Sequence, residues 1–224
     1  MGAFIVISIL FGINTLITTY LLCKKRDRDY IRSKIVTSVM FVLLGGLGLF
    51  LTQKDLLAEL LPGLIFCLIG DGLLGMAGEA ENGLKKAPFW AGIVSFSLAH
   101  LIFSRAFLGQ VPMNTSLILL VAGAVIVITW ITTISRKFDY KSHKLPCLIY
   151  SVFIGLLCAS GCNLILGANG NIHFVILGIG GILFMISDLL LSMKLFLIKE
   201  PKGIRIFNLP VYYLAIFLII YGAA

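Results

Sequence analysis

The stretch LLAELLPGLIFCLIGDGLLGMAG, residues 56–78, decides the fold class. Its apolar residues run continuously instead of alternating in period two, and about 20 such residues cross a bilayer as an α-helix. After Glu59 near its start, Asp71 places a second ionisable carboxyl group deep inside the run. The stretch therefore predicts a membrane-spanning helix with an acidic side chain that needs an explanation.

The remainder of the chain has the same character. Of its 224 residues, 59% are hydrophobic and 12% are charged, whereas soluble domains carry about 25% charged residues. The mean hydropathy is +1.06. Because the apolar runs are continuous, a β-barrel is excluded. We predict an all-α, polytopic bundle that forms one domain over residues 1–224. Its eight transmembrane helices are expected at 2–23, 34–52, 56–78, 88–108, 114–134, 145–166, 171–194 and 207–223.

The basic residues predict the orientation of the spans. Of the 18 lysine and arginine residues, 16 belong to the odd-numbered connectors and their edges, and only Lys54 and Arg105 fall elsewhere. The positive-inside rule then places the odd-numbered connectors in the cytoplasm and both termini outside, in a multi-pass protein of the cell (inner) membrane. The same rule accounts for the net charge of +8 without a nucleic-acid partner.

A second acidic motif matches the first. ISDLLLSM, residues 186–193, repeats the pattern of IGDGLLGM, residues 69–76. At 1.5 Å per residue, Asp71 and Asp188 lie about 10 Å and about 9 Å from the cytoplasmic ends of their spans. They could therefore share one site as an aspartate dyad. A parallel 4+4 pseudo-repeat would produce the pattern, and so would convergence on a useful helix sequence.

Metal and cofactor chemistry finds little support in the sequence. Five cysteines show no zinc-type spacing. His143 and His173 are expected at opposite ends of the bundle, so the three histidines are too far apart to form one metal site. There is no nucleophile elbow, Walker loop, HExxH motif or dinucleotide glycine fingerprint. We therefore predict no cofactor and no metal, and any chemistry must rest on carboxyl groups.

Further polar residues are candidates beside the aspartates. His100 lies on a serine stripe in the fourth span and could orient a carboxyl group, shuttle a proton or hydrogen-bond between helices. Lys34 could meet a lipid phosphate, although the positive-inside rule alone also predicts a lysine there. Tyr150 and Tyr212 could reach a polar site or serve as interfacial anchors. Ser192 shares a helix face with Asp188.

Several longer motifs resemble those of a known family. GDGLLGM, PFWAG and FSLAHLIF, followed by GILFMISDLLLSMKLF and VYYLAIFLI, occur in this order between Lys34 and the last helix. This arrangement resembles the YhhN-type family of eight-span membrane proteins, whose characterised members are lysoplasmalogenases. The resemblance implies polar site residues at Asp71, His100 and Asp188, together with Lys34 and Tyr212.

The chain departs from the family pattern at three positions. Ile35 stands where a proline is common, Phe103 where a tyrosine is common, and Ile216 where a glutamine is common. Both aspartates are retained. The departures therefore concern the identity of the substrate.

The resemblance implies hydrolysis of the vinyl ether bond of a lysoplasmalogen. The products are a fatty aldehyde and a glycerophospho-alcohol. Such a reaction needs one protonated carboxyl group, which protonates the alkenyl carbon, and one carboxylate, which stabilises the resulting oxocarbenium ion or activates water. The substrate is then a lysophospholipid that enters from the bilayer, and Asp71, Asp188 and His100 are the predicted catalytic residues. Lys34, Tyr150, Tyr212 and Ser192 are predicted to bind the substrate.

Two other functions fit the same residues. Paired intramembrane acids and glycine-rich helices also suit a proton-coupled transporter, although such sites usually lie at the membrane midplane. A lipid-binding or assembly protein would use the aspartates only to join helices. Membrane lipids are expected partners in each case, and the sequence does not determine the oligomeric state.

Overall fold

The computed structural model describes residues 2–24, 27–80, 83–199 and 202–224. In these ranges the chain forms eight long helices: α1 (Gly2–Cys23), α2 (Asp27–Thr52), α3 (Asp55–Ala77), α4 (Lys86–Leu108), α5 (Thr115–Ile134), α6 (Lys144–Leu166), α7 (Ile172–Phe196) and α8 (Lys202–Ala223). All eight are long and apolar enough to cross a membrane. The prediction of an all-helical, eight-span membrane protein is confirmed. The minor elements are the antiparallel hairpin of β1 (Glu79–Ala80) and β2 (Gly83–Leu84), and the 3-10 turn η1 (Lys141–His143).

Two helices begin well before the predicted spans. Helix α2 begins at Asp27 instead of residue 34, and α8 begins at Lys202 instead of residue 207. Hydropathy marks only the apolar part of a helix, whereas the backbone hydrogen bonds continue into the polar residues at its end. As a result, Lys34 lies about two turns inside α2 and not at its start.

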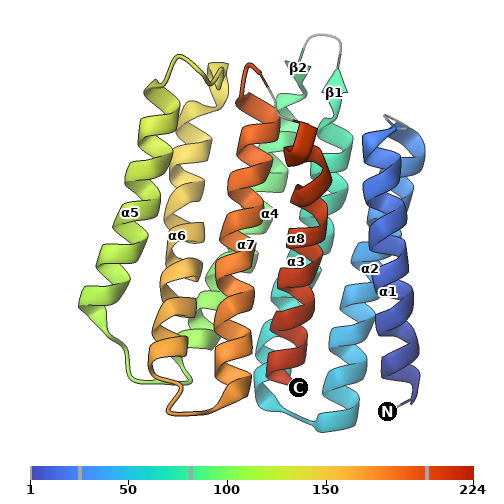
Figure 1. The fold of residues 1–224 in the computed structure, drawn as a ribbon, viewed down its shortest axis with the longest axis vertical. Coiled ribbons are helices and arrows are strands. Elements are labelled where there is room, and N and C mark those ends of the chain that lie inside the picture. Colours follow the sequence, from blue (N-terminus) through green and yellow to red (C-terminus); the bar gives the residue numbers. More distant parts are fainter. Residues whose placement is uncertain (1, 25–26, 81–82, 200–201) are drawn as a thin grey trace. The chain divides into compact units, whose positions relative to one another are not determined.

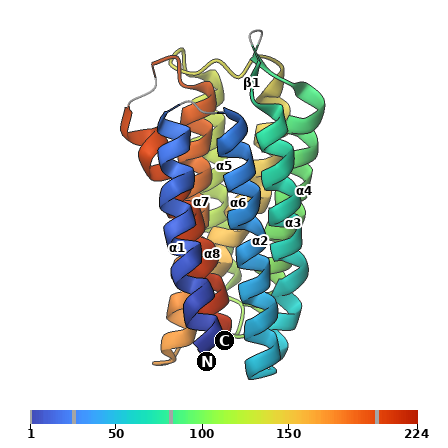
Figure 2. The same ribbon diagram turned by 90° about the vertical axis from the view of Figure 1, so that its right-hand side faces the viewer.

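Contacts within the chain define two compact units, and their boundary falls inside α4, after Ile102. In the first unit α1 packs on α2, and α2 packs on α3 (Figure 2). The first part of α4 approaches α3 closely, because a Cβ atom on Gly70 would lie 2.6 Å from the ring of Phe96. The single domain and the 4+4 pseudo-repeat stay predictions.

The second unit contains α5, α6, α7 and α8, which pack in chain order (Figure 1). The connector between α5 and α6 is attached to the end of α7. Phe138 forms an isolated antiparallel bridge with Leu197, and the backbone N–H of Asp139 donates to the carbonyl oxygen of Phe196 at 2.7 Å. The ring of Tyr140 stacks on that of Phe196, with centroids 4.3 Å apart. These contacts hold the end of α7 that follows Asp188.

Helices α6 and α7 meet at two glycines, which gives a test of the packing. A Cβ atom on Gly178 would lie 2.5 Å from the carbonyl oxygen of Gly161, and backbone cannot move aside easily. Gly178→Ala is therefore expected to lower the free energy of unfolding by about 1–3 kcal/mol. Gly123→Ala in α5 is the matched control, since a Cβ atom there meets nothing within 4 Å. Thermal unfolding in detergent should show a lower midpoint for Gly178→Ala alone, and equal midpoints would contradict the close approach.

Candidate functional site

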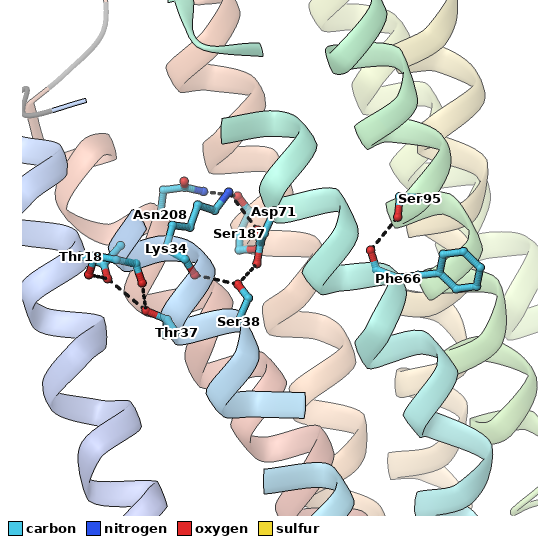
Figure 3. Close-up of polar contacts among 10 residues, drawn as sticks. Thr18, Lys34, Thr37, Ser38, Phe66, Asp71, Ser95, Ser187 and Asn208 are labelled. Carbon is cyan, nitrogen blue, oxygen red and sulfur yellow. Dashed lines mark hydrogen bonds and ion pairs between the residues drawn. The ribbon is translucent and has the colours of Figure 1, made fainter. Parts of the chain in front are cut away.

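Asp71 is buried in the first unit with donors on both of its carboxylate oxygens. The Nζ atom of Lys34 lies 2.9 Å from Oδ1, and the hydroxyl group of Ser38 donates to Oδ2 at 2.6 Å (Figure 3). Lys34 and Ser38 are one turn apart on α2, so both side chains face the same neighbour. The site of Asp71 is thus built across the contact between α2 and α3.

The two charged side chains of this cluster are almost fully removed from solvent. The exposed fraction of the side chain is 1% for Asp71 and 8% for Lys34. A lone buried charge is very costly, and an opposite charge with good hydrogen bonds offsets that cost. The pairing therefore explains how an apolar span tolerates Asp71. It also gives a carboxylate partner to Lys34, whose contact with a lipid phosphate stays a prediction.

The face of α3 that carries Asp71 continues against α2 at Gly75, one turn later. A Cβ atom on Gly75 would lie 3.4 Å from the side chain of Ile31 on α2, which is an ordinary van der Waals contact.

A polar network between α1 and α2 lies beside this cluster, and the sequence reasoning did not predict it. The amide of Asn14 donates to Thr37 at 2.7 Å, and Thr18 shares a hydrogen bond with Ser33 at 2.6 Å. A signal was present in the sequence, because Asn14 and Thr18, like Ser33 and Thr37, are spaced by one turn. The network ties α1 to the helix that carries Lys34.

His100 lies in the same unit as Asp71. It is fully buried in α4, and its ring stacks on Phe96 with centroids 6.5 Å apart and an interplanar angle of 28°. Phe96 in turn packs against Gly70, the residue before Asp71. These contacts connect His100 to the neighbourhood of Asp71 through packing, and its catalytic role stays a prediction.

Asp188 belongs to the second unit, where it is half-buried on α7. The hydroxyl group of Tyr150 on α6 donates to its Oδ2 atom at 2.6 Å. The sequence predicted Tyr150 as a substrate contact, and the structure shows it on the second acidic side chain. Next to Asp188, the carbonyl oxygen of Ser187 accepts from the amide of Asn208 on α8 at 2.7 Å, which joins α7 to α8.

Ser192 and Tyr212, the other predicted substrate contacts, lie in the second unit with Asp188. Ser192 shares a hydrogen bond with the hydroxyl group of Tyr140 at 2.8 Å, so it helps attach the connector between α5 and α6 to α7. Tyr212 is buried on α8 and meets Phe184 edge-on, with centroids 5.3 Å apart. Their contacts with substrate stay predictions.

The structure thus brings Lys34 to Asp71 and Tyr150 to Asp188, each pair inside one unit. The expectation that both aspartates serve one site stays a prediction. Over the described residues, no group of three or more histidine, cysteine or acidic side chains could hold a metal ion.

Comparison with known proteins adds a family to this geometry. The model of the YhhN family matches residues 29–223, a range that contains Lys34, Asp71, His100 and Asp188. The chain belongs to the YhhN family. The family match confirms the resemblance seen in the sequence motifs, and it leaves the whole of α1, including Asn14, outside the matched range.

Two curated relatives of this YhhN-family protein carry the name lysoplasmalogenase TMEM86A, one from Bos taurus and one from Homo sapiens. Each is 26% identical over 186 residues, which cover 82% of this chain and 72% of the relative. No solved structure matches the chain. The comparisons therefore support a hydrolase of this class at the level of the family.

Proposed function

We propose that this YhhN-family protein hydrolyses the vinyl ether bond of a lysoplasmalogen within the membrane. The observation that carries the proposal is the buried Asp71 carboxylate, which the structure holds with a lysine and a serine inside a membrane span. A second acid, Asp188, has an ordered hydrogen bond from Tyr150. The similarity to lysoplasmalogenases from cattle and human supports the choice of reaction.

The reaction needs only proton transfer and charge stabilisation. A carboxylic acid protonates the alkenyl carbon distal to the ether oxygen, and the electron pair of the double bond forms the new C–H bond. The oxocarbenium ion that results takes up water, which returns one proton to the carboxyl group. The hemiacetal then collapses to a fatty aldehyde and a glycerophospho-alcohol. Two carboxyl groups with different environments suit these steps, as in glycosidases.

The exposed apolar surface of the helices suits a lipid substrate. Many large apolar side chains remain exposed on the helices, as expected for surfaces that contact acyl chains. An alkenyl tail can therefore approach from the bilayer. Ser192 and Tyr212 stay the predicted substrate contacts, whereas Lys34 and Tyr150 are engaged by the acids and are better explained as residues that hold them.

A pair of substrates tests the proposal directly. Purified protein is expected to release a fatty aldehyde from a lysoplasmalogen and none from the analogue with a saturated ether, because only the vinyl ether forms the oxocarbenium ion on protonation. Chromatography of the aldehyde checks this result. Equal turnover of both lipids would contradict the mechanism. Proton-dependent solute uptake by proteoliposomes without lipid turnover would instead identify a transporter.

A further inference from the structure

We propose that the connector between α5 and α6 binds the headgroup of an anionic phospholipid of the bilayer. Residues 135–144, which are the connector and the first residue of α6, and residues 197–199, which follow α7, form a surface that we call the connector platform. The platform lies entirely within the second unit (Figure 1). The inference goes beyond vinyl ether hydrolysis and holds whatever reaction the protein catalyses.

The connector has a defined backbone because it pairs with the end of α7. In addition to the bridge between Phe138 and Leu197, the backbone N–H of Ile198 donates to the carbonyl oxygen of Lys137 at 3.0 Å. Four residues after Lys137, Lys141 has a φ of 44°, in the left-handed region that a lysine seldom adopts unless the surrounding structure holds it there. The side chains of the connector therefore start from fixed positions.

Tyr140 anchors the connector in the bundle. It is 1% exposed, and its ring stacks on that of Phe196. Its hydroxyl group shares hydrogen bonds with Thr132 on α5 at 3.0 Å and with Ser192 on α7 at 2.8 Å. Removal of this side chain would release the connector from both helices without changing the charge of the platform.

The platform is strongly basic. Among the described residues 135–144 and 197–199, five are lysine or arginine and one, Asp139, is acidic. The carboxylate of Asp139 lies 3.8 Å from the Nζ atom of Lys141, and both side chains are more than half exposed, so this ion pair contributes little. The platform therefore presents a net positive charge. Its basic residues, all exposed, are Arg136, Lys137, Lys141, Lys144 and Lys199.

Apolar neighbours place these cations at the level of the lipid headgroups. Ile134 at the end of α5, Leu145 beside Lys144 and Ile198 beside Lys199 are all exposed. In a membrane protein such side chains face acyl chains, so the adjacent cations lie where the hydrocarbon ends and the lipid phosphates begin. A phospholipid whose headgroup carries a net negative charge matches this surface.

The docking of the connector separates this proposal from a general excess of basic residues. The positive-inside rule concerns the side of the membrane on which a connector lies, and an unstructured basic loop satisfies it. A docked connector has already lost its conformational freedom, so less entropy is lost when a headgroup binds. The contacts of Tyr140 therefore favour a lipid bound at a defined place over a diffuse attraction to the bilayer.

Native mass spectrometry of the purified protein, titrated with phosphatidylglycerol or phosphatidylcholine, tests the proposal. The apparent Kd is expected to be at least about 10-fold lower for the anionic phosphatidylglycerol. Removal of three platform cations, in Lys137→Gln/Lys141→Gln/Lys144→Gln, should weaken phosphatidylglycerol binding about 100-fold, at about 5-fold for each cation. The matched control removes three exposed cations of the first unit, in Lys24→Gln/Arg28→Gln/Arg32→Gln, and should change the Kd far less.

Tyr140→Ala tests the docking at constant charge. Phosphatidylglycerol binding is expected to weaken about 3–10-fold, because the released connector must become ordered when the headgroup binds. If Tyr140→Ala does not fold, Tyr140→Phe takes its place, since it keeps the ring and removes only the hydrogen bonds to Thr132 and Ser192. A smaller loss in the same direction is expected from Tyr140→Phe.

Equal binding of the two lipids, or equal effects of the two triple variants, would overturn the proposal. Unchanged binding by the folded Tyr140 variant would overturn the role of the docked connector. Displacement of phosphatidylglycerol by glycerol 3-phosphate at a similar concentration would identify a soluble phosphate as the ligand and overturn the assignment to a lipid. None of these measurements depends on aldehyde release, so the proposed function can fail while the connector platform stands.

Discussion

Asp188→Asn is expected to lower kcat for vinyl ether hydrolysis by about 10²–10⁴-fold, the usual contribution of a general acid or base. Asparagine has nearly the same shape and can still accept the hydrogen bond from Tyr150, which donates at 2.6 Å. It can neither transfer an acidic proton nor carry the negative charge of a carboxylate. The helix packing should therefore survive while the reaction slows, and the rate of aldehyde release measures the loss.

Asp71→Asn is expected to have a comparable effect. The amide can neither transfer a proton nor stabilise an oxocarbenium ion with a negative charge, and removal of one preorganised electrostatic group costs about 10²–10³-fold in kcat. Exposed acids provide the controls: Asp55→Asn at the start of α3 and Asp139→Asn in the connector before α6 should leave the rate unchanged. Near-normal hydrolysis by folded Asp71→Asn and Asp188→Asn would exclude the two-carboxylate mechanism.

Lys34→Met is expected to lower the free energy of unfolding by about 3–5 kcal/mol, the cost of breaking a buried ion pair on one side. Methionine fills much of the same space, so the effect comes from the uncompensated carboxylate of Asp71, whose exposed fraction is 1%. Equilibrium unfolding in mixed detergent micelles measures the change. Lys54→Met is the control, because Lys54 is exposed at the start of α3.

The double variant separates stability from catalysis. Lys34→Met/Asp71→Asn removes both charges, so most of the lost stability should return, since neutral replacements of a buried pair are often tolerated well. Hydrolysis should stay as low as in Asp71→Asn. A double variant that is no more stable than Lys34→Met would show that Lys34 stabilises the fold through packing and not through Asp71.

The helices themselves were predictable from the sequence, because each transmembrane segment must satisfy its own backbone hydrogen bonds. Apolar runs of sufficient length therefore determine the number of spans, and α1 agrees with its predicted range of 2–23. The beginnings of α2 and α8 were less predictable, since polar residues continue a helix beyond the apolar run without changing the hydropathy signal.

The candidate acids were also predictable, whereas their partners were not. Asp71 and Asp188 stand out because charge is rare inside a span. Lys34 seemed explained by the positive-inside rule, which describes where lysines occur along a span and not which way they face. Its pairing with Asp71 depends on the relative rotation and height of α2 and α3.

By itself the sequence determined eight apolar helices, two acidic positions and membership of the YhhN family, because each of these is carried by residues close together in the chain. Only the tertiary structure decided that Lys34 and Ser38 hold Asp71 and that Tyr150 holds Asp188. Each of these contacts joins different helices. A side chain's partner across such a contact depends on how the helices pack, and the hydropathy pattern gives no information about that packing.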